Sequence, residues 1–356
     1  MEDEMLELKN QKESKFSYSK LNTYESCPWK YKLQYIDHHF IDSSTIANEF
    51  GTLIHFIEET IANDIIANNH EPYFMIDDNK YIDLFINCGV EGHPIQDILG
   101  ARKIKEKYPE AFYEKDKYGF SYDDKANIYL NYGIYRLRDF LANNRHLRII
   151  GVETPFDIRY EDKIFHGFID RVFKDTVTNQ IIIEDIKTWQ NIKGHDLVTP
   201  LQFVFYTQAA QEIFNVQEDA ISCFYELPLA GERHQAGTKG YMKRGAKKIA
   251  KLLDAINAKD YTPKPTPLCH WCSFSDTCPT QPEEGKNLCP YRSNWTKEKK
   301  DFSVDFEWLG IENHEAVLEA YIKKHQPKLI TNKLDQLNII TLECSKSDRI
   351  RIARRL

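Results

Sequence analysis

The stretch Gly167-Phe-Ile-Asp-Arg171, followed closely by Glu184-Asp-Ile-Lys-Thr188, decides the fold of this chain. Each segment lies in a run of β-branched and aromatic residues, and the turn formers Asp175 and Asn179 stand between the two runs. Such runs predict β-strands, and a short polar connection predicts that the two strands pair antiparallel. We therefore expect a hairpin in which aliphatic residues give way to charged ones.

Three of these charged residues can meet on one face of the hairpin. Side chains alternate between the faces of a strand, so Asp185 and Lys187 project together, and Asp170 is expected opposite them. Two carboxylates suit Mg²⁺ or Mn²⁺, and a nearby lysine can orient or help deprotonate an attacking water. A solvated face is the common alternative, but the preceding Ile181-Ile-Ile183 is typical of a buried central strand, where charges need a partner or a metal. The pattern favours metal-assisted phosphodiester hydrolysis.

The segment Gly51-Thr-Leu-Ile-His55 predicts a helix in which His55 shares a face with Glu58 and Glu59. A histidine on an apolar helix is often a satisfied core residue. As a ligand, it would add a nitrogen donor to an oxygen site and favour Mn²⁺ over Mg²⁺.

A second helix is predicted to begin at Thr199-Pro200, with the threonine as N-cap and the proline in the first turn. On it, Gln202 and Tyr206 are four residues apart and share a face. Tyr206 can serve as a packing residue or contact nucleic acid, and spacing alone leaves both open.

The cysteine spacing indicates a metal site. Cys269-x-x-Cys272 directs two thiolates at one centre, and Cys278 can supply a third. The fourth ligand must come from Cys27, Cys289 or His270, and four thiolates suit either [4Fe–4S] or Zn²⁺. The remaining cysteines have no ligand-like spacing, and Cys223 is expected to be a buried strand residue; they are Cys88, Cys223 and Cys344.

These motifs together resemble the PD-(D/E)XK nuclease superfamily, in its RecB-like branch with an iron–sulphur staple, as in AddB-type nuclease domains and CRISPR-associated nucleases that trim single-stranded ends. The resemblance covers about residues 16–290. It implies an α/β (α+β) restriction-endonuclease-like core, with a central mixed sheet between helices, a helical N-terminal region and a C-terminal cysteine cluster. The implied metal ligands are His55, Asp170, Asp185 and the backbone carbonyl of Ile186.

The resemblance also implies the remaining roles. Lys187 would orient the attacking water, and Gln202 and Tyr206 would help position the DNA strand. Glu153 lies where the branch often has a structural or metal-proximal glutamate, and simple exposure on a strand is its alternative. For the cluster, the resemblance selects four cysteines and leaves Cys289 as a spare: Cys27, Cys269, Cys272 and Cys278.

The resemblance and the element pattern divide the chain into five expected segments. These are a loose arm (1–15), a mainly helical part (16–148), the nuclease core (149–258), the cysteine segment (259–290) and an extension of unassigned role (291–356). Within them we expect a long helix near 123–145, four strands at 149–158, 164–173, 181–188 and 220–227, and an amphipathic helix at 314–325.

Composition bounds the function further. The net charge of −7 argues against a surface uniformly adapted to DNA, although a basic run at 239–251 could line a phosphate-tracking channel. The chain lacks a Walker-type phosphate loop, so a helicase motor or recombination machinery would have to come from a partner. It opens with charged residues and shows no apolar targeting segment, from which we expect a cytoplasmic protein without a membrane partner.

The sequence thus predicts a Mg²⁺- or Mn²⁺-dependent DNA nuclease with a structural cluster, acting as an exonuclease on single-stranded DNA or free ends. Two alternatives remain. One is a DNA- or partner-binding subunit or phage-encoded modulator of a recombination complex with little catalysis of its own. The other is a zinc-bearing nucleic-acid-binding protein, which would leave Asp170, Asp185 and Lys187 unexplained.

Overall fold

The computed structural model describes residues 16–39, 41, 44–70, 78–160, 163–264, 269, 272–275, 288–289, 291–295, 300–305, 328–330 and 339–343. They fall into two compact units. Unit 1 comprises the chain up to Tyr18 together with Ser44–Ile249, and unit 2 comprises Ser19–Ser43 together with the chain from Ala250 onward. The arm 1–15, the helix expected at 314–325, and Cys278 and Cys344 lie outside the described residues.

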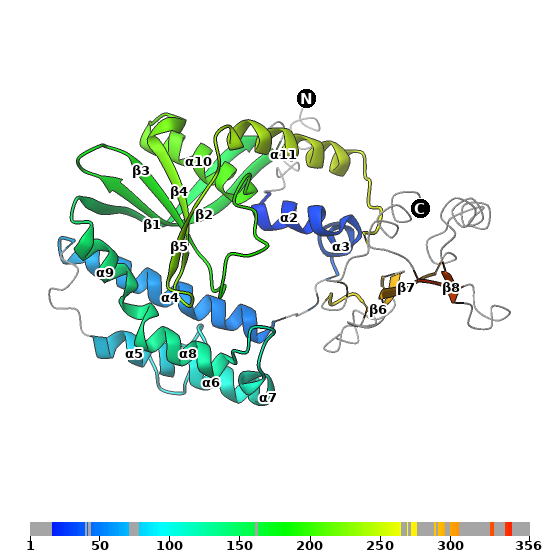
Figure 1. Cartoon of the computed structure of the whole chain (residues 1–356), viewed down its shortest axis with the longest axis horizontal. Helices are drawn as coiled ribbons and strands as arrows, with labels where there is room; N and C mark the ends of the chain where they lie inside the picture. Colours follow the sequence, from blue (N-terminus) through cyan, green and yellow to red (C-terminus); the bar gives the residue numbers. More distant parts are fainter. Residues whose placement is uncertain are drawn as a thin grey trace, which may run out of the picture. The chain divides into compact units, whose positions relative to one another are not determined.

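Unit 1 is built on a five-stranded mixed sheet in the order β1-β2-β3-β4-β5 (Figure 1). The pairs β1–β2, β2–β3 and β4–β5 are antiparallel, whereas β3 and β4 are parallel and are joined through a crossover helix. The strands are β1 (Leu147–Tyr160), β2 (Lys163–Asp175), β3 (Ile181–Ile186), β4 (Ile221–Leu227) and β5 (Glu232–Ala236).

The predicted hairpin is confirmed as β2–β3. Its turn is closed by the Asp175 carboxylate, which accepts hydrogen bonds from the amides of Val177 and Thr178 at 2.8 and 3.1 Å. Asn179 takes up the left-handed conformation with φ of 60°, which asparagine tolerates better than most residues. The turn formers seen in the sequence therefore do what their chemistry predicts.

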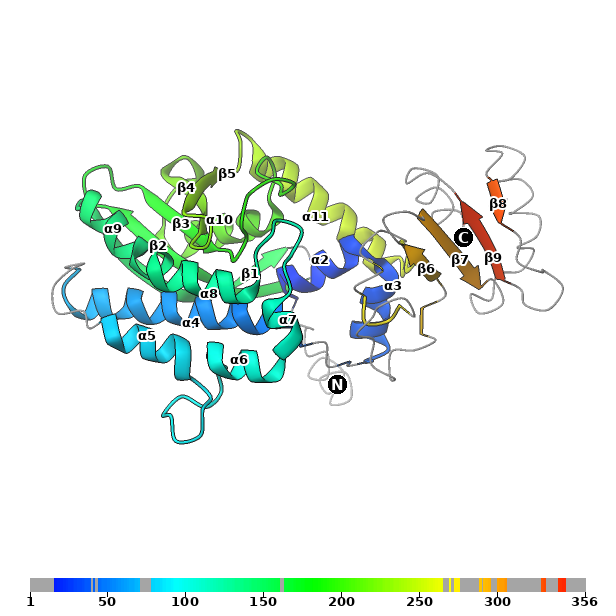
Figure 2. The ribbon, with the colours of Figure 1, turned by 60° about the horizontal axis from the view of Figure 1, so that its bottom comes forward.

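Helices cover both faces of this sheet (Figures 1 and 2). The crossover helix α10 (Leu201–Phe214) packs on one face, against β1, β3 and β4, while α4 packs on the other, against β1 and β2. The short η3 (Glu218–Ala220) links α10 to β4, and α11 (Tyr241–Asn257) begins after β5. The other helical segments of unit 1 are α4 (Ile46–Ala67) and those that follow it in the chain before β1: α5 (Asp78–Asn87), α6 (Ala101–Lys107), α7 (Pro109–Tyr113), α8 (Tyr122–Asn131), η2 (Gly133–Tyr135) and α9 (Arg136–Asn143). This mixed sheet flanked by helices is the restriction-endonuclease-like α/β core expected from the sequence.

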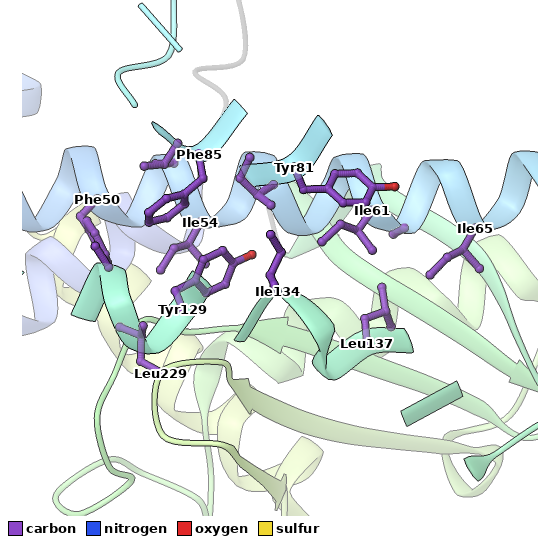
Figure 3. Packing of buried hydrophobic residues seen from close by; sticks show 14 of the residues in the cluster. Phe50, Ile54, Ile61, Ile65, Tyr81, Phe85, Tyr129, Ile134, Leu137 and Leu229 are labelled. Carbon is purple, nitrogen blue, oxygen red and sulfur yellow. The ribbon is translucent and has the colours of Figure 1, made fainter. Parts of the chain in front are cut away.

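The apolar face of α4 forms the centre of a hydrophobic core (Figure 3). Isoleucines recur along it at helical spacing, and Ile54, Ile57 and Ile61 have no exposed surface. Aromatic rings from neighbouring helices close the core, with Phe85 stacked on Tyr129 at 5.2 Å between ring centroids. Burial of this face fixes the axis of α4, and with it the side chains that α4 presents to the sheet.

The long helix expected near 123–145 is wrong in one respect, because it is interrupted. Residues 122–131 and 136–143 form separate helices, α8 and α9, with a short 3₁₀ turn at Gly133 between them. A Cβ at Gly133 would lie 2.4 Å from Cδ2 of Tyr129, so only glycine allows this close approach. Ring packing therefore overrides the continuous helical pattern.

Two local predictions also differ from the structure. Strand β5 was not expected, because Glu232-Arg-His-Gln-Ala236 lacks apolar alternation and becomes a strand through pairing with β4. The predicted threonine cap of α10 is wrong, since Pro200 is the N-cap and Thr199 Oγ1 instead accepts a hydrogen bond from Arg244 Nε at 2.9 Å. Arg244 thus links two loops through hydrogen bonds, so its guanidinium is engaged within the fold rather than held ready for a phosphate.

Unit 2 brings together segments far apart in the chain. Helices α2 (Tyr18–Ser26) and α3 (Pro28–Tyr31) and the π-helix η1 (Lys32–Ile36) contribute its N-terminal part. Tyr24 donates to the carbonyl of Asp260 at 2.5 Å, and Trp29 Nε1 donates to the carbonyl of Leu288 at 3.1 Å. A separate four-stranded antiparallel sheet, in the order β6-β7-β9-β8, is formed by β6 (Tyr291–Trp295), β7 (Lys300–Asp305), β8 (Lys328–Ile330) and β9 (Ile339–Glu343).

Among the described residues, no helix is long and apolar enough to cross a membrane.

Candidate active site

The site lies where β2 and β3 separate. Their ladder runs from Lys174 opposite Ile181 to Arg171 opposite Glu184 and goes no further. Beyond it, Asp170 Oδ2 accepts a hydrogen bond from the backbone amide of Ile186 at 2.7 Å. A carboxylate thus takes the place of a strand carbonyl, which holds Asp170 beside Asp185 at the fork.

Strand β1 is also irregular at this level. Val152 pairs with Arg171 and Thr154 with Ile169, so Glu153 is skipped in the ladder. Glu153 has a φ of 42°, in the left-handed region that a side chain with a Cβ adopts at a cost. The register on both sides of Glu153 places it opposite Asp170, and a carboxylate oxygen of each lies within 4.8 Å of the other.

Helix α4 supplies the histidine. His55 Nδ1 lies 3.6 Å from Asp170 Oδ2, and the Asp170 side chain is only 10% exposed. Among the described residues, His55, Glu153 and Asp170 form the one group of three candidate ligands whose donor atoms all lie within 4.8 Å of one another. An open pocket of roughly 630 Å³ borders all three and also Glu59.

Asp185 and Lys187 form an ion pair, as their shared strand face predicted. Lys187 Nζ lies 2.7 Å from Asp185 Oδ2, yet that oxygen accepts no hydrogen bond of acceptable geometry from the described residues. Gln202 Nε2 donates to the other oxygen, Oδ1, at 2.8 Å and also lies 2.7 Å from the Tyr206 hydroxyl. Gln202 and Tyr206 therefore converge on the Asp185 carboxylate.

The charges of the site suit a divalent cation. Burial raises the pKa of Asp185 to about 6, an effect that Lys187 opposes and Asp170 reinforces. Burial and then the Asp170, Glu59 and Asp185 carboxylates raise the pKa of Glu153 to about 7. Acids held this close favour protonation unless a positive charge lies among them. Oxygen donors, one imidazole and a buried oxygen without a hydrogen bond fit a divalent metal.

The opposite side of the same strands carries a buried ion network. Arg171 Nε donates to Glu184 Oε2 at 2.7 Å, and Arg171 Nη1 donates to Glu58 Oε2 at 3.1 Å. Arg233 Nε donates to Glu184 Oε1 at 2.8 Å, and the Tyr129 hydroxyl donates to Glu58 Oε1 at 2.9 Å. Each of Arg171, Glu184 and Glu58 is within three residues of a candidate ligand, so the network fixes α4 against the hairpin behind the site.

The structure distinguishes two glutamates of α4 that helical spacing alone makes equivalent. Glu58 and Glu59 both share a helical face with His55, but Glu58 turns into the buried network and Glu59 borders the pocket. The sequence alone does not decide the partner of Arg171, and the structure shows its ion pairs with Glu184 and Glu58. Spacing alone could not separate adjacent glutamates, because the choice depends on Arg171 arriving from another element.

The cysteines fall into two groups. Cys88 and Cys223 are buried, and Cys223 lies on β4 as predicted, 3.4 Å from the Thr207 hydroxyl. The structure describes four of the cluster candidates, and all four are partly buried: Cys27, Cys269, Cys272 and Cys289. No three of these described thiols lie close enough together to form a group of metal donors.

A mixed sheet with carboxylates at a strand fork and a lysine directly after the strand is typical of a metal-dependent nuclease core. The family model of the PD-(D/E)XK nuclease superfamily matches residues 15–279 of the chain, and the protein belongs to this superfamily. Membership implies a metal-dependent nuclease that acts on DNA and uses divalent metal ions. A comparison with curated proteins gave no significant match.

Proposed function

We propose that this protein is a Mg²⁺- or Mn²⁺-dependent exonuclease that hydrolyses single-stranded DNA or DNA ends. The observation that carries the proposal is the convergence of His55, Glu153 and Asp170 beside the Asp185–Lys187 pair. A divalent cation there would be held by these three side chains, with Asp185 and the backbone carbonyl of Ile186 as further candidate donors. When bound there, a divalent cation supplies polarisation of the scissile phosphate and a more acidic water.

Lys187 acts as a cation in this mechanism. Burial alone would lower its pKa, but the Asp185 and Asp170 carboxylates outweigh burial and raise it. The residue therefore stays protonated at neutral pH and donates hydrogen bonds, so it orients the attacking water and stabilises negative charge that develops on the phosphate. Of the two roles expected from the sequence, orientation is favoured over deprotonation.

Gln202 and Tyr206 hold the Asp185 carboxylate in place. With Oδ1 engaged by the Gln202 amide, Oδ2 remains directed to Lys187 and the cation position. Tyr206 is almost completely buried and packs edge-on against Phe156 at 5.8 Å. We therefore expect Gln202 and Tyr206 to help position the DNA strand indirectly, by orienting the Asp185 carboxylate.

The reaction can be tested with three DNA substrates and one metal. Linear single-stranded, linear double-stranded and circular single-stranded DNA are incubated with Mn²⁺, with and without chelator. We expect chelator-sensitive release of short products from linear single strands and no cutting of circles, because an exonuclease needs an end. Rapid cutting of circles would replace the exonuclease with an endonuclease, and no cutting of any substrate would favour a binding subunit.

We further propose that Cys27, Cys269, Cys272 and Cys278 hold a [4Fe–4S] cluster, with Cys289 as the spare ligand and Zn²⁺ as the alternative metal. Contacts on both sides of Cys27 support this. Lys264 Nζ donates to the carbonyl of Glu25 at 2.8 Å, and Trp29 reaches the residue before Cys289. These bonds join residues 239 and 259 positions apart, and closing such a loop costs about 5 kcal/mol of chain entropy.

Anaerobic purification tests the cluster. The protein should be brown and carry about four irons per chain. Cys27→Ala and Cys272→Ala should bleach the colour and lower the melting temperature, because the clasp between distant segments is lost. Cys88→Ala is the control and should keep the colour. Colour that persists in Cys27→Ala but disappears in Cys289→Ala would indicate a local C-terminal site, and colourless protein with one zinc would reject the cluster.

A further inference from the structure

A ladder of aromatic rings leads from the core to the surface beside the site. Phe203 packs against Tyr225 at 4.8 Å, and Tyr225 against Trp189 at 5.2 Å between ring centroids. Trp189 in turn lies parallel to His195, at 3.4 Å and 9° between the ring planes. Phe203 is fully buried, Trp189 is half-buried and His195 is exposed. The ladder therefore ends in a ring that has one covered face and one face toward solvent.

The two outer rings belong to a loop that starts and ends at the catalytic site. Trp189 follows Lys187 by two residues, and the loop ends at α10, where Gln202 binds Asp185. Lys187 Nζ lies 6.0 Å from the centroid of the Trp189 ring. A strand with its phosphate beside Lys187 would thus have its neighbouring nucleotides within reach of this loop.

A second loop, residues 114–121, faces the first. The Asn191 side chain lies within hydrogen-bonding reach of the Tyr118 hydroxyl and lowers its pKa, which places the two loops side by side. Tyr118 is 46% exposed and Phe120 is 38% exposed, although both are large hydrophobic residues. Lys117, next in sequence to Tyr118, is also exposed.

This second loop is preorganised. The Asp116 carboxylate accepts hydrogen bonds from the amides of Tyr118 and Phe120 at 2.8 and 3.2 Å. Its other oxygen pairs with Lys125 of α8 at 2.9 Å. The exposed rings therefore stand on a fixed turn, which limits the entropy lost when a ligand packs against them.

We propose that His195, Trp189 and Tyr118 form a binding site for unpaired nucleobases of the strand that enters the catalytic site. Bases stack on aromatic faces without regard to sequence, and a nearby lysine such as Lys117 can contact the phosphate between them. Partial desolvation of the ring, one face of which is stacked on Trp189, followed by the charges of Lys117 and Lys187, lowers the pKa of His195, so at neutral pH its ring stacks as a neutral imidazole. The inference rests on the proposed function in one respect, namely that the substrate is DNA.

The test measures binding without cleavage. Fluorescence anisotropy follows the binding of a labelled oligo(dT) and of an abasic oligonucleotide of equal length, in chelator. His195→Ala and Trp189→Ala should weaken oligo(dT) binding about five-fold or more, since one stacked base supplies roughly 5- to 100-fold in affinity. Abasic binding should change less than about two-fold, because backbone charge is untouched. Tyr132→Ala, which removes a ring 72% exposed on another surface, should change neither.

Each outcome decides the inference. Unchanged oligo(dT) binding in His195→Ala, an exposed position whose loss spares the fold, overturns it. An equal loss on both oligonucleotides also overturns it, since that reports charge or misfolding. A protein that needs Trp189 for oligo(dT) but cleaves nothing with Mn²⁺ supports the base site and rejects the nuclease. A protein that cleaves while ignoring both substitutions rejects the base site alone.

Discussion

The two sides of the β2–β3 hairpin hold the same kinds of charge in opposite conditions. On one side Asp170 and Asp185 crowd together with Glu153, and burial raises the pKa of Asp185 and Glu153. On the other side Glu184 lies between two arginines; burial would raise its pKa, but Arg171 and Arg233 lower it. Adjacent residues of one strand thus serve the candidate active site and the buried ion network. The difference teaches that neighbouring positions of one strand can hold acids in opposite ways: two arginines keep Glu184 ionised, whereas Lys187 alone opposes the crowded acids of the site.

The largest expected effect concerns the candidate active site. Lys187→Ala should lower the cleavage rate about 100- to 1,000-fold, as loss of one preorganised electrostatic contact does. Folding and metal-free DNA binding should remain, because the residue acts on the transition state. Single-turnover kinetics and anisotropy measure both. Lys174→Ala, an exposed lysine on β2, is the control, and a loss of only a few-fold in Lys187→Ala would contradict the assigned role.

The next effect concerns the buried ion network on the opposite side. Arg171→Met should cost about 3–5 kcal/mol in the free energy of unfolding, since Glu184 and Glu58 would each lose a buried partner. Urea unfolding measures it, with Lys174→Met as the control on the same strand. The double variant Arg171→Met/Glu184→Leu should recover part of the loss. If the single variant is as stable as the parent, the network contributes nothing to holding α4.

A smaller effect concerns the metal. His55→Ala should weaken Mn²⁺ binding about ten-fold or more and reduce the preference for Mn²⁺ over Mg²⁺, because the only nitrogen donor is removed. Calorimetric titration of both metals measures the change. His146→Ala, on a half-exposed side chain near Asp175, is the control. Titrations of His55→Ala and parent that overlay would make His55 a packing residue.

The smallest effect is a pH dependence that separates the two sides. Folded pKa values of Glu153 and Asp185 lie above their unfolded values, so these groups stabilise the metal-free protein at low pH. That stability is full below about pH 4 and is lost as pH rises through about 6 to 7. Glu184, with a lowered pKa, stabilises above its unfolded value and loses this on acidification.

Unfolding in chelator at pH 5 and pH 8 tests this sign. Glu153→Gln should be about 1–2 kcal/mol more stable than the parent at pH 8 and nearly equal to it at pH 5. Saturating Mn²⁺ should remove the advantage. An advantage at pH 5 that disappears at pH 8 would reverse the assignment of Glu153.

The elements that could be predicted from the sequence are those whose local residue pattern already favours the structure they form in the fold. The hairpin follows from its turn formers and alternation, and the Asp185–Lys187 pair follows from strand periodicity. Strand β5 could not be predicted, because its residues are polar and only the edge of β4 makes them a strand. The role of Glu59, the break at Gly133 and the contact of Thr199 with Arg244 likewise depend on partners distant in sequence.

The bond from the Ile186 amide to Asp170 Oδ2 has a spectroscopic consequence. An amide proton that points at a carboxylate shifts strongly when that carboxylate is neutralised or draws away. The amide resonance of the buried Ile186 therefore reports on the occupancy of the site. In a ¹⁵N-labelled sample, this single peak would follow cation binding at the fork independently of any substrate.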